Sequence, residues 1–246
     1  NALPAVPDPR LNLNNQPWSQ PSLFGALTGT LRIEQALNAD WRWTAQVGQQ
    51  RLRTDDRLAY AFGCDAEGNY DRFCSDGTYD LYDFRSEHEH RRQTAGQLKL
   101  KGRVATGTVT HDLGIGVLAA RVRNRFDLQA YNYVGTGNVQ GTAFTAPDPT
   151  LGDQNTNRDE RSLEFSLHDA IRWNAQWSTW LGVRHTRLDR DSVRTNGTRP
   201  TGYAANVTTP WVALAYQLQD GPLLYASWGQ GVESQIVPNK SAYTNA

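Results

Sequence analysis

Apolar and polar residues alternate with a period of two over much of this chain. In residues 22–37 the aliphatic side chains occupy odd-numbered positions, which are Leu23, Leu27, Leu31, Ile33 and Leu37. Such alternation predicts a β-strand with one apolar and one polar face. The turn Asn38-Ala39-Asp40 follows, because Asn and Asp favour tight turns, and residues 41–49 alternate again. We therefore expect a β-hairpin here.

The same hairpin pattern recurs further along the chain. The alternating pairs of segments are residues 97–105 and 109–117, residues 163–173 and 177–183, and residues 211–218 and 223–230. The short turns between them are Thr106-Gly107-Thr108, Asn174-Ala175-Gln176 and Gln219-Asp220-Gly221. The Asp-Gly pair in the last turn is a strong hairpin signal. Together with the first hairpin, the pattern predicts about eight antiparallel strands.

Long polar connections separate these hairpins. They are rich in Gly, Asn, Asp, Thr and Pro, and they occupy residues 54–92, 127–159 and 189–209. Loops of this length are unusual in a compact soluble domain and usually carry function. Short turns on one side and long loops on the other are typical of transmembrane β-barrels, whose turns are periplasmic and whose loops are extracellular. The predicted fold class is therefore all-β, an antiparallel transmembrane β-barrel segment.

Strand length favours this fold over a soluble β-sandwich, which also alternates apolar and polar residues. Strands of about a dozen residues match a tilted membrane strand better than the usual ~5 to 6 residues. Trp residues gather where strands meet turns, as they do in an interfacial girdle. No run approaches the ~20 apolar residues that a membrane-spanning helix needs, so a helical membrane protein is excluded. Equal numbers of basic and acidic residues, 25 each, argue against nucleic acid as a partner.

The strand pattern also predicts which side chains face lipid. Only every second residue of each strand would do so, which is compatible with a mean hydropathy of -0.65. The expected lipid-facing residues are Leu27, Leu31, Leu98, Leu100, Leu113, Ile115, Phe165, Leu167, Leu181 and Val183. A register error of one residue would exchange the two faces of the sheet.

The chain has two cysteines, Cys64 and Cys74, within the polar segment CDAEGNYDRFC. Such a pair suits a small disulfide loop in an oxidising compartment such as the periplasm or the cell surface. Two free thiols are the alternative.

The first residues show neither an initiator Met nor the charged and apolar stretches of a signal peptide, and we expect the chain to be an excerpt of a longer protein.

The last hairpins resemble a known family. Residues 223–231, LLYASWGQG, leave a DG turn and lead into a segment that bears Pro and Asn, and residues 173–192 read WNAQWSTWLGVRHTRLDRDS. Both resemble the late barrel strands of TonB-dependent siderophore receptors, in which a strand of the form LYASYSxGF leaves a turn such as DG. The similarity extends along the whole chain as a regular succession of strands, short turns and long loops, and it is most specific over residues 211–231.

That resemblance implies a receptor of the bacterial outer membrane that takes up ferric siderophores by TonB-dependent active transport. It implies no enzyme activity and no cofactor, since iron arrives only as a siderophore complex. The expected partners are the ferric siderophore, the TonB complex, and the surrounding outer-membrane lipid and lipopolysaccharide. Barrels of this family have roughly 22 strands and an N-terminal plug domain that contacts TonB. Residues 1–246 are expected to be part of the barrel, without the plug domain.

Receptors of this family hold the siderophore between extracellular loops and the upper lumen. Aromatic rings there offer stacking surfaces, and Arg offers charge and hydrogen-bond donors. By this resemblance the candidate ligand-binding residues are Tyr79, Tyr82, Phe84, Arg85, Tyr131, Tyr133, Arg123 and Arg125. Tyr79, Tyr82 and Phe84 come from the longest predicted loop, residues 54–92. Alternatively, these rings belong to the outer aromatic belt or pack the loops together.

Other functions rest on weaker patterns. The run Glu87-His88-Glu89-His90 supplies two possible metal ligands on one strand face, whereas zinc sites need three or four. The acidic residues at alternate positions after Cys64 resemble part of a calcium-binding loop, but the rest of that pattern is missing. His111-Asp112 and His168-Asp169 are adjacent residues that point to opposite faces of a strand, and no GxSxG motif accompanies them. No catalytic or metal-binding residue is therefore assigned. A complete eight-stranded porin-like or adhesin-like barrel and an outer-membrane hydrolase stay as alternatives.

Overall fold

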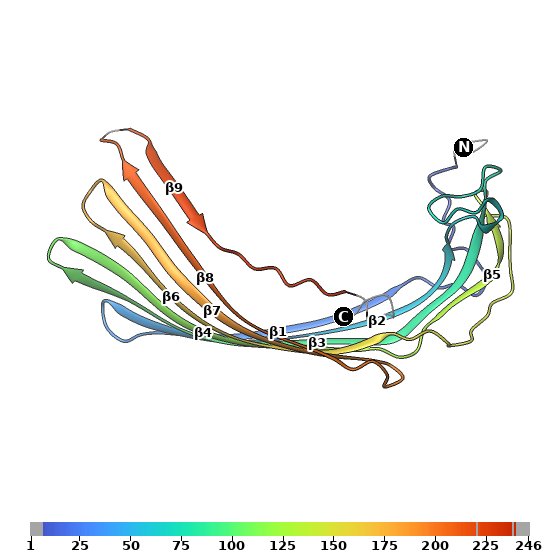
Figure 1. The fold of residues 1–246 in the computed structure, drawn as a ribbon, viewed down its shortest axis with the longest axis horizontal. Helices are drawn as coiled ribbons and strands as arrows, with labels where there is room; N and C mark the ends of the chain where they lie inside the picture. Colours follow the sequence, from blue (N-terminus) through green and yellow to red (C-terminus); the bar gives the residue numbers. More distant parts are fainter. Residues whose placement is uncertain (1–6, 220, 238, 240–246) are drawn as a thin grey trace.

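The protein, seen in a computed structural model that describes residues 7–219, 221–237 and 239, is built on one antiparallel sheet of nine strands (Figure 1). The strands are β1 (Leu23–Ala36), β2 (Trp41–Ala61), β3 (Thr78–Thr106), β4 (Val109–Arg125), β5 (Ala130–Asn138), β6 (Thr156–Arg172), β7 (Trp177–Arg194), β8 (Thr201–Gln217) and β9 (Leu223–Gly229). A short 3-10 helix, η1 (Asp65–Glu67), follows β2. Within these described residues no helix has the length and apolar character needed to cross a membrane.

Strands that follow one another in the sequence are mostly neighbours in the sheet. The order is β1-β2-β3-β4-β6-β7-β8-β9, and β5 pairs with β3 at the end of the sheet away from the short turns. We call the end with the short turns the turn end and the opposite end the loop end. The predicted hairpins and their turns are confirmed, apart from Asp220, which is outside the described residues. β1 and β9 are the two edges of this sheet, so the described strands form an open wall.

The predicted bounds of the long loops are wrong, because the strands extend further than their hydrophobic alternation. β2 continues to Ala61 and β3 starts at Thr78, so only residues 62–77 connect them. Residues 195–200 connect β7 and β8, and the connection between β4 and β6 contains β5. In residues 50–57 of β2 and 85–94 of β3 most positions on both faces are polar, which hides the period of two. Hydrogen bonds to neighbouring strands nevertheless keep the backbone extended.

The strand register gives the sheet an apolar face. Residues directly opposite in an antiparallel pair share a face, and one such row is Ile33, Ala45, Leu98, Val117 and Phe165. All the residues predicted to face lipid lie on this face. Many of them are exposed, Phe165 by 51%, which is the state expected of side chains that contact lipid.

The opposite, polar face is the concave face of the sheet. It carries charged side chains such as Arg42, Lys99 and Arg184. The stretch after β9 crosses the concave side in Figure 1, and its Ser234 accepts a hydrogen bond from Arg190 of the polar face at 3.1 Å. A groove of about 700 Å³ on this face is lined by more basic than acidic residues. A polar concave face and an apolar convex face match the lumen and lipid sides of a barrel wall.

A β-bulge in β3 changes which side chains lie on each face near the loop end. Thr54 pairs with Glu89 and Asp56 pairs with Ser86, so β3 has one residue more than β2 at this point. His88 lies inside the bulge with a positive φ of 58°. The even-numbered residues of β3 therefore lie on the apolar face between the turn end and the bulge, and on the polar face beyond the bulge.

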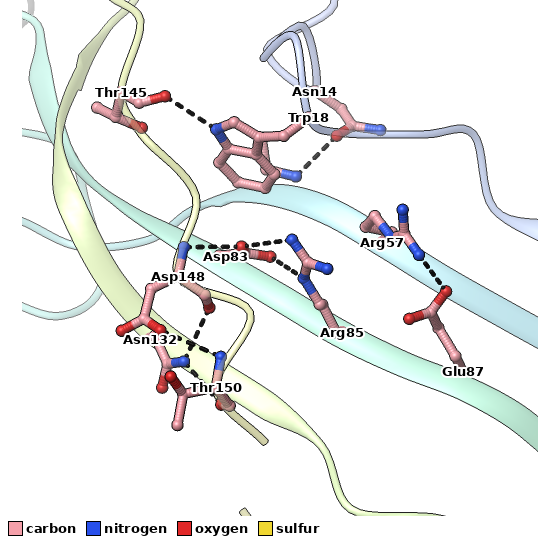
Figure 2. A network of polar contacts seen from close by, with 11 residues as sticks. Asn14, Trp18, Arg57, Asp83, Arg85, Glu87, Asn132, Thr145, Asp148 and Thr150 are labelled. Atoms are coloured by element: carbon pink, nitrogen blue, oxygen red, sulfur yellow. Dashed lines mark hydrogen bonds and ion pairs between the residues drawn. The ribbon is translucent and has the colours of Figure 1, made fainter. Parts of the chain in front are cut away.

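A small hydrophobic core lies at the loop end, on the side of β2, β3 and β5 away from the polar face. Its buried residues are Ala59, Tyr79, Leu81 and Val139. Trp18, from the segment before β1, packs against this core and donates a hydrogen bond from Nε1 to the backbone carbonyl of Thr145 at 3.0 Å (Figure 2). The core thus joins the segment before β1 and the segment after β5 to the sheet.

Candidate functional site

Aromatic side chains gather at the loop end of β2, β3 and β5. Tyr82 lies opposite both Tyr60 and Tyr133 in the register, and Phe84 lies opposite Tyr131. The rings of Tyr82 and Tyr131 stack with centroids 4.6 Å apart and 9° between their planes, and the ring of Tyr60 lies 5.7 Å from that of Tyr131. We call the following residues the aromatic cluster: Tyr60, Phe62, Tyr82, Phe84, Tyr131 and Tyr133.

The aromatic cluster lies on the polar face, because Tyr60 continues the even-numbered series of β2 that includes Arg42. Its rings are partly open, with Tyr133 57% exposed and Tyr131 36% exposed. Rings that contact one another and keep open surfaces offer a stacking site. Burial, together with the phenols of Tyr60 and Tyr82, raises the pKa of Tyr131 to about 12. Its hydroxyl is therefore a neutral hydrogen-bond donor at neutral pH.

Of the aromatic residues predicted to bind a ligand, the structure brings all but Tyr79 into this cluster. Tyr79 is 2% exposed in the hydrophobic core, where its ring centroid lies 4.8 Å from that of Phe73. It is odd-numbered in β3 and therefore lies on the other face from Tyr82. Sequence reasoning missed Tyr60 and Phe62. The signal was present, because Leu58, Tyr60 and Phe62 occupy every second position directly before the cysteine loop.

Arg85 lies on the side of the sheet opposite the aromatic cluster. Its guanidinium donates hydrogen bonds to both carboxylate oxygens of Asp83, at 2.9 and 3.0 Å, and Asp83 is 0% exposed. Asp83 also accepts a hydrogen bond from the backbone N–H of Asp148, and Asn132 of β5 donates to the carbonyls of Asp148 and Thr150 (Figure 2). The geometry makes Arg85 a positioning residue for β5. A direct ligand contact by Arg85 stays a prediction.

Arg123 and Arg125 of β4 lie on the apolar face, beyond its aliphatic rows. With Arg121 they surround one carboxylate, that of Asp159 on β6: Arg121 Nη2 lies 3.4 Å and Arg123 Nε 3.2 Å from Asp159 Oδ1, and Arg125 donates a hydrogen bond to Oδ2. The register separates these arginines from the aromatic cluster, which lies on the polar face. The structure therefore does not bring the predicted arginines and the predicted rings together.

The connection between β2 and β3 is closed by the predicted disulfide between Cys64 and Cys74. Both cysteines are buried. Inside the loop, the hydroxyl and the backbone N–H of Ser75 donate hydrogen bonds to Glu67 and hold the pKa of its carboxyl below the usual value. The disulfide and these bonds make residues 62–77 a compact cap beside the aromatic cluster.

The other candidate patterns form structural contacts. His111 Nδ1 lies 2.8 Å from Asp169 Oδ2 on the neighbouring strand, a cross-strand pair that adjacency in the sequence did not reveal. The guanidinium groups of Arg57 and Arg91 donate hydrogen bonds to Glu87 and Glu89, at 2.7 and 2.6 Å, near the bulge. In the part of the chain that the structure describes, no three His, Cys, Asp or Glu side chains are grouped so that they could hold a metal ion.

The curved antiparallel sheet, with its polar concave face and apolar convex face, defines a segment of a β-barrel wall. In a comparison with known families, the family described as "TonB dependent receptor-like, beta-barrel" matches residues 3–245. The chain belongs to this family, which confirms the resemblance seen in its last hairpins. A search of curated proteins found no match.

Solved siderophore receptors have a similar fold. The ferric-catecholate import receptor Fiu from E. coli K12 aligns with a TM-score of 0.68 and 15% identity, over 85% of this chain and 35% of that receptor. BauA, the ferric preacinetobactin receptor from Acinetobacter baumannii, aligns with a TM-score of 0.64 and 18% identity, over 84% of this chain and 30% of BauA. The siderophore receptor PiuA from the same organism aligns with a TM-score of 0.64 and 14% identity, over 85% of this chain and 32% of PiuA. The chain thus spans about a third of the length of these receptors.

Proposed function

We propose that this chain is part of the wall and mouth of an outer-membrane receptor for ferric siderophores. Membership of the TonB-dependent receptor family supports the class of protein. The observation that carries the proposal is the aromatic cluster, whose rings stack on one another at the loop end of the polar face and keep exposed surfaces. Aromatic groups of a siderophore would stack on these rings, and the neutral hydroxyl of Tyr131 would donate a hydrogen bond to a chelating oxygen.

The polar face beyond the cluster suits a ligand of negative charge. Its groove is lined by Arg32, Arg42, Lys99, Lys101 and Arg103, against fewer acidic residues. Iron complexes of siderophores are often anionic, and an excess of positive charge on a concave surface raises the local concentration of such a ligand. Capture at the aromatic cluster followed by attraction along this face would move the complex inwards.

The remaining parts of the proposal concern the whole receptor. Iron is cargo that enters as the siderophore complex, and no resident cofactor takes part. A plug domain outside this chain would contact the TonB complex, which supplies the energy of transport. The aliphatic rows of the apolar convex face would place the part of the sheet towards the turn end across the bacterial outer membrane, with the loop end outside it.

The test is equilibrium binding of a ferric catecholate siderophore to the full receptor in outer membranes. Replacing Tyr82 and Tyr131 with Ala removes the stacked pair at the centre of the cluster. Aromatic stacking contributes ~1–3 kcal/mol per ring, so the double variant should bind at least tenfold more weakly. Phe144→Ala is the matched control, because Phe144 is a 62% exposed ring in the segment after β5 and lies outside the cluster.

Equal amounts of each receptor in the membrane are confirmed by immunoblot before affinities are compared. If the double variant binds the siderophore as tightly as the parent receptor, the aromatic cluster is not the binding site. A loss of affinity of the same size in Phe144→Ala would also contradict the proposal, since it would reflect general disturbance of the loops.

A further inference from the structure

A hydrogen bond between two side chains spans the β-bulge in β3. The hydroxyl of Ser86 donates to Oε1 of Glu89 at 2.5 Å. In a regular strand, residues three positions apart point to opposite faces of the sheet. Ser86 and Glu89 share the polar face because the bulge adds one residue between them, at His88. This hydrogen bond therefore forms only while the bulge is in place.

The hydrogen bond across the bulge is buried and has further partners on both sides. Ser86 is 3% and Glu89 is 7% exposed. The guanidinium of Arg91 donates to Oε2 of Glu89 at 2.6 Å and to the hydroxyl of Thr54 on β2 at 3.1 Å. The side chain of Gln129, directly before β5, donates to the hydroxyl of Ser86 at 2.6 Å. We call these five residues the bulge clasp, and they join β2, β3 and the start of β5.

The backbone of the bulge needs such support. His88 has a φ of 58°, a left-handed conformation that residues other than Gly adopt only at a cost in free energy. Its backbone N–H donates to a side chain of the neighbouring strand, Oδ1 of Asp55, at 2.7 Å. Side-chain hydrogen bonds thus hold the bulge on both faces of the sheet, in competition with a regular ladder.

The choice between the bulged and the regular ladder decides where the aromatic cluster lies. With the bulge, Phe84 lies opposite Leu58 on the polar face. A regular ladder continued from the pair Thr54 and Glu89 would place Phe84 opposite Ala59, on the side of the hydrophobic core. The other rings of β3 would turn with it, and the rings of β5 would follow because β5 pairs with β3. Only the rings of β2 would stay on the polar face.

We propose that Glu89 and Ser86 are positioning residues of the aromatic cluster. Their hydrogen bond across the bulge selects the register that places the rings of β3 and β5 on the polar face, and Gln129 extends the same control to the start of β5. Neither Glu89 nor Ser86 touches the ligand. The inference rests on the proposed function for the role of the rings, whereas the register of β3 is measured without a ligand.

Oxidative cross-linking of cysteine pairs in the full receptor measures the register. Leu58→Cys with Phe84→Cys should form a disulfide, because these residues are directly opposite in the bulged ladder. Ala59→Cys with Phe84→Cys should form one only in the regular ladder. Adding Glu89→Ala or Ser86→Ala should shift the ratio of the two products towards the second by about tenfold or more, as expected for the loss of a buried hydrogen bond. Mass spectrometry identifies each cross-linked peptide and separates it from the natural disulfide.

Glu87→Ala is the matched control for the cross-linking experiment. The carboxylate of Glu87 also accepts a hydrogen bond from one arginine, Arg57, at 2.7 Å (Figure 2), but this pair does not span the bulge. The variant removes the same charge from a neighbouring position of the same strand. It should leave the ratio of the two cross-linked products unchanged.

Siderophore affinity tests the consequence for the proposed binding site. Glu89→Ala should weaken binding of a ferric catecholate siderophore roughly tenfold or more, as expected when stacking rings leave the site. Deletion of His88 separates positioning from general stability. Without this residue Thr54 still faces Glu89 and Asp56 still faces Ser86, now in a ladder that has no bulge. Glu89→Ala should therefore keep its affinity in the deletion background, where a residue needed only for folding would still be required.

The inference is wrong if the cross-linking ratio stays the same in Glu89→Ala and Ser86→Ala, or if Glu87→Ala shifts it equally. It is also wrong if Glu89→Ala loses as much affinity in the His88 deletion as in the parent receptor. A shifted ratio with unchanged siderophore affinity would support the positioning role and contradict the proposed function. If the deletion variant does not assemble, the cross-linking ratios decide the question alone.

Discussion

The buried carboxylate of Asp83 should control the position of β5 and therefore the shape of the aromatic cluster. Asp83→Ala removes the acceptor of two hydrogen bonds from Arg85 and one from the backbone N–H of Asp148. Because the Arg85 side chain is only 12% exposed, its charge would be left without a partner in a poorly hydrated site. Breaking a buried ion pair in this way costs about 3–5 kcal/mol.

The free-energy cost should be confined to the region of β5, since among the described residues β5 pairs with β3 alone. Hydrogen exchange of the full receptor, followed by mass spectrometry, should show exchange of amides in residues 130–150 faster by roughly two to three orders of magnitude. Amides of β6 and β7 should exchange at their original rates. Siderophore affinity should fall as well, because Tyr131 and Tyr133 are carried by β5.

A paired variant separates the charge from the packing. Replacing both Asp83 and Arg85 with Leu removes the two charges together, and most of the protection of β5 should return, since an apolar pair of similar volume can substitute for a buried ion pair. The reasoning fails if Asp83→Ala leaves exchange in residues 130–150 unchanged, or if the Leu pair is as unprotected as Asp83→Ala alone.

Two further predictions concern the faces of the sheet and the phenol of Tyr131. A cysteine at Leu98 should react with a membrane-soluble maleimide and one at Lys99 with an aqueous maleimide, and the opposite labelling would show that the apolar face does not contact lipid. The folded-state pKa of Tyr131 lies above the ordinary value of 10.0, so its contribution to stability is complete below pH 10 and is lost as the pH rises towards 12. Burial also raises the pKa values of Tyr79 and Tyr82, so ultraviolet titration should show several late-ionising phenols, of which Tyr131→Phe removes one; an identical titration curve in that variant would refute the assignment.

Local patterns in the sequence determined the hairpins at the turn end, their turns and the two faces of the sheet there, but not β5 or the extension of the strands towards the loop end. Leu98 and Leu100 alternate with Lys99 and Lys101. The pleat of a strand by itself places the leucines on one face of the sheet and the lysines on the other. The hairpin turns follow from short Asn, Asp and Gly segments, which bend the chain whatever surrounds them. The disulfide was predictable because Cys64 and Cys74 lie in one polar segment. Each of these features depends on neighbours along the chain.

Only the tertiary structure decided how distant segments combine. The bulge at His88 moves Tyr82 and Phe84 to the polar face, although even-numbered residues such as Leu98 lie on the apolar face of the same strand. Tyr131 joins them because β5 pairs with β3. Arg123, expected beside these rings, lies on the opposite face. The physical reason is that cross-strand neighbours are set by register, by bulges and by hydrogen bonds between strands, and none of these is encoded in the period of a single segment.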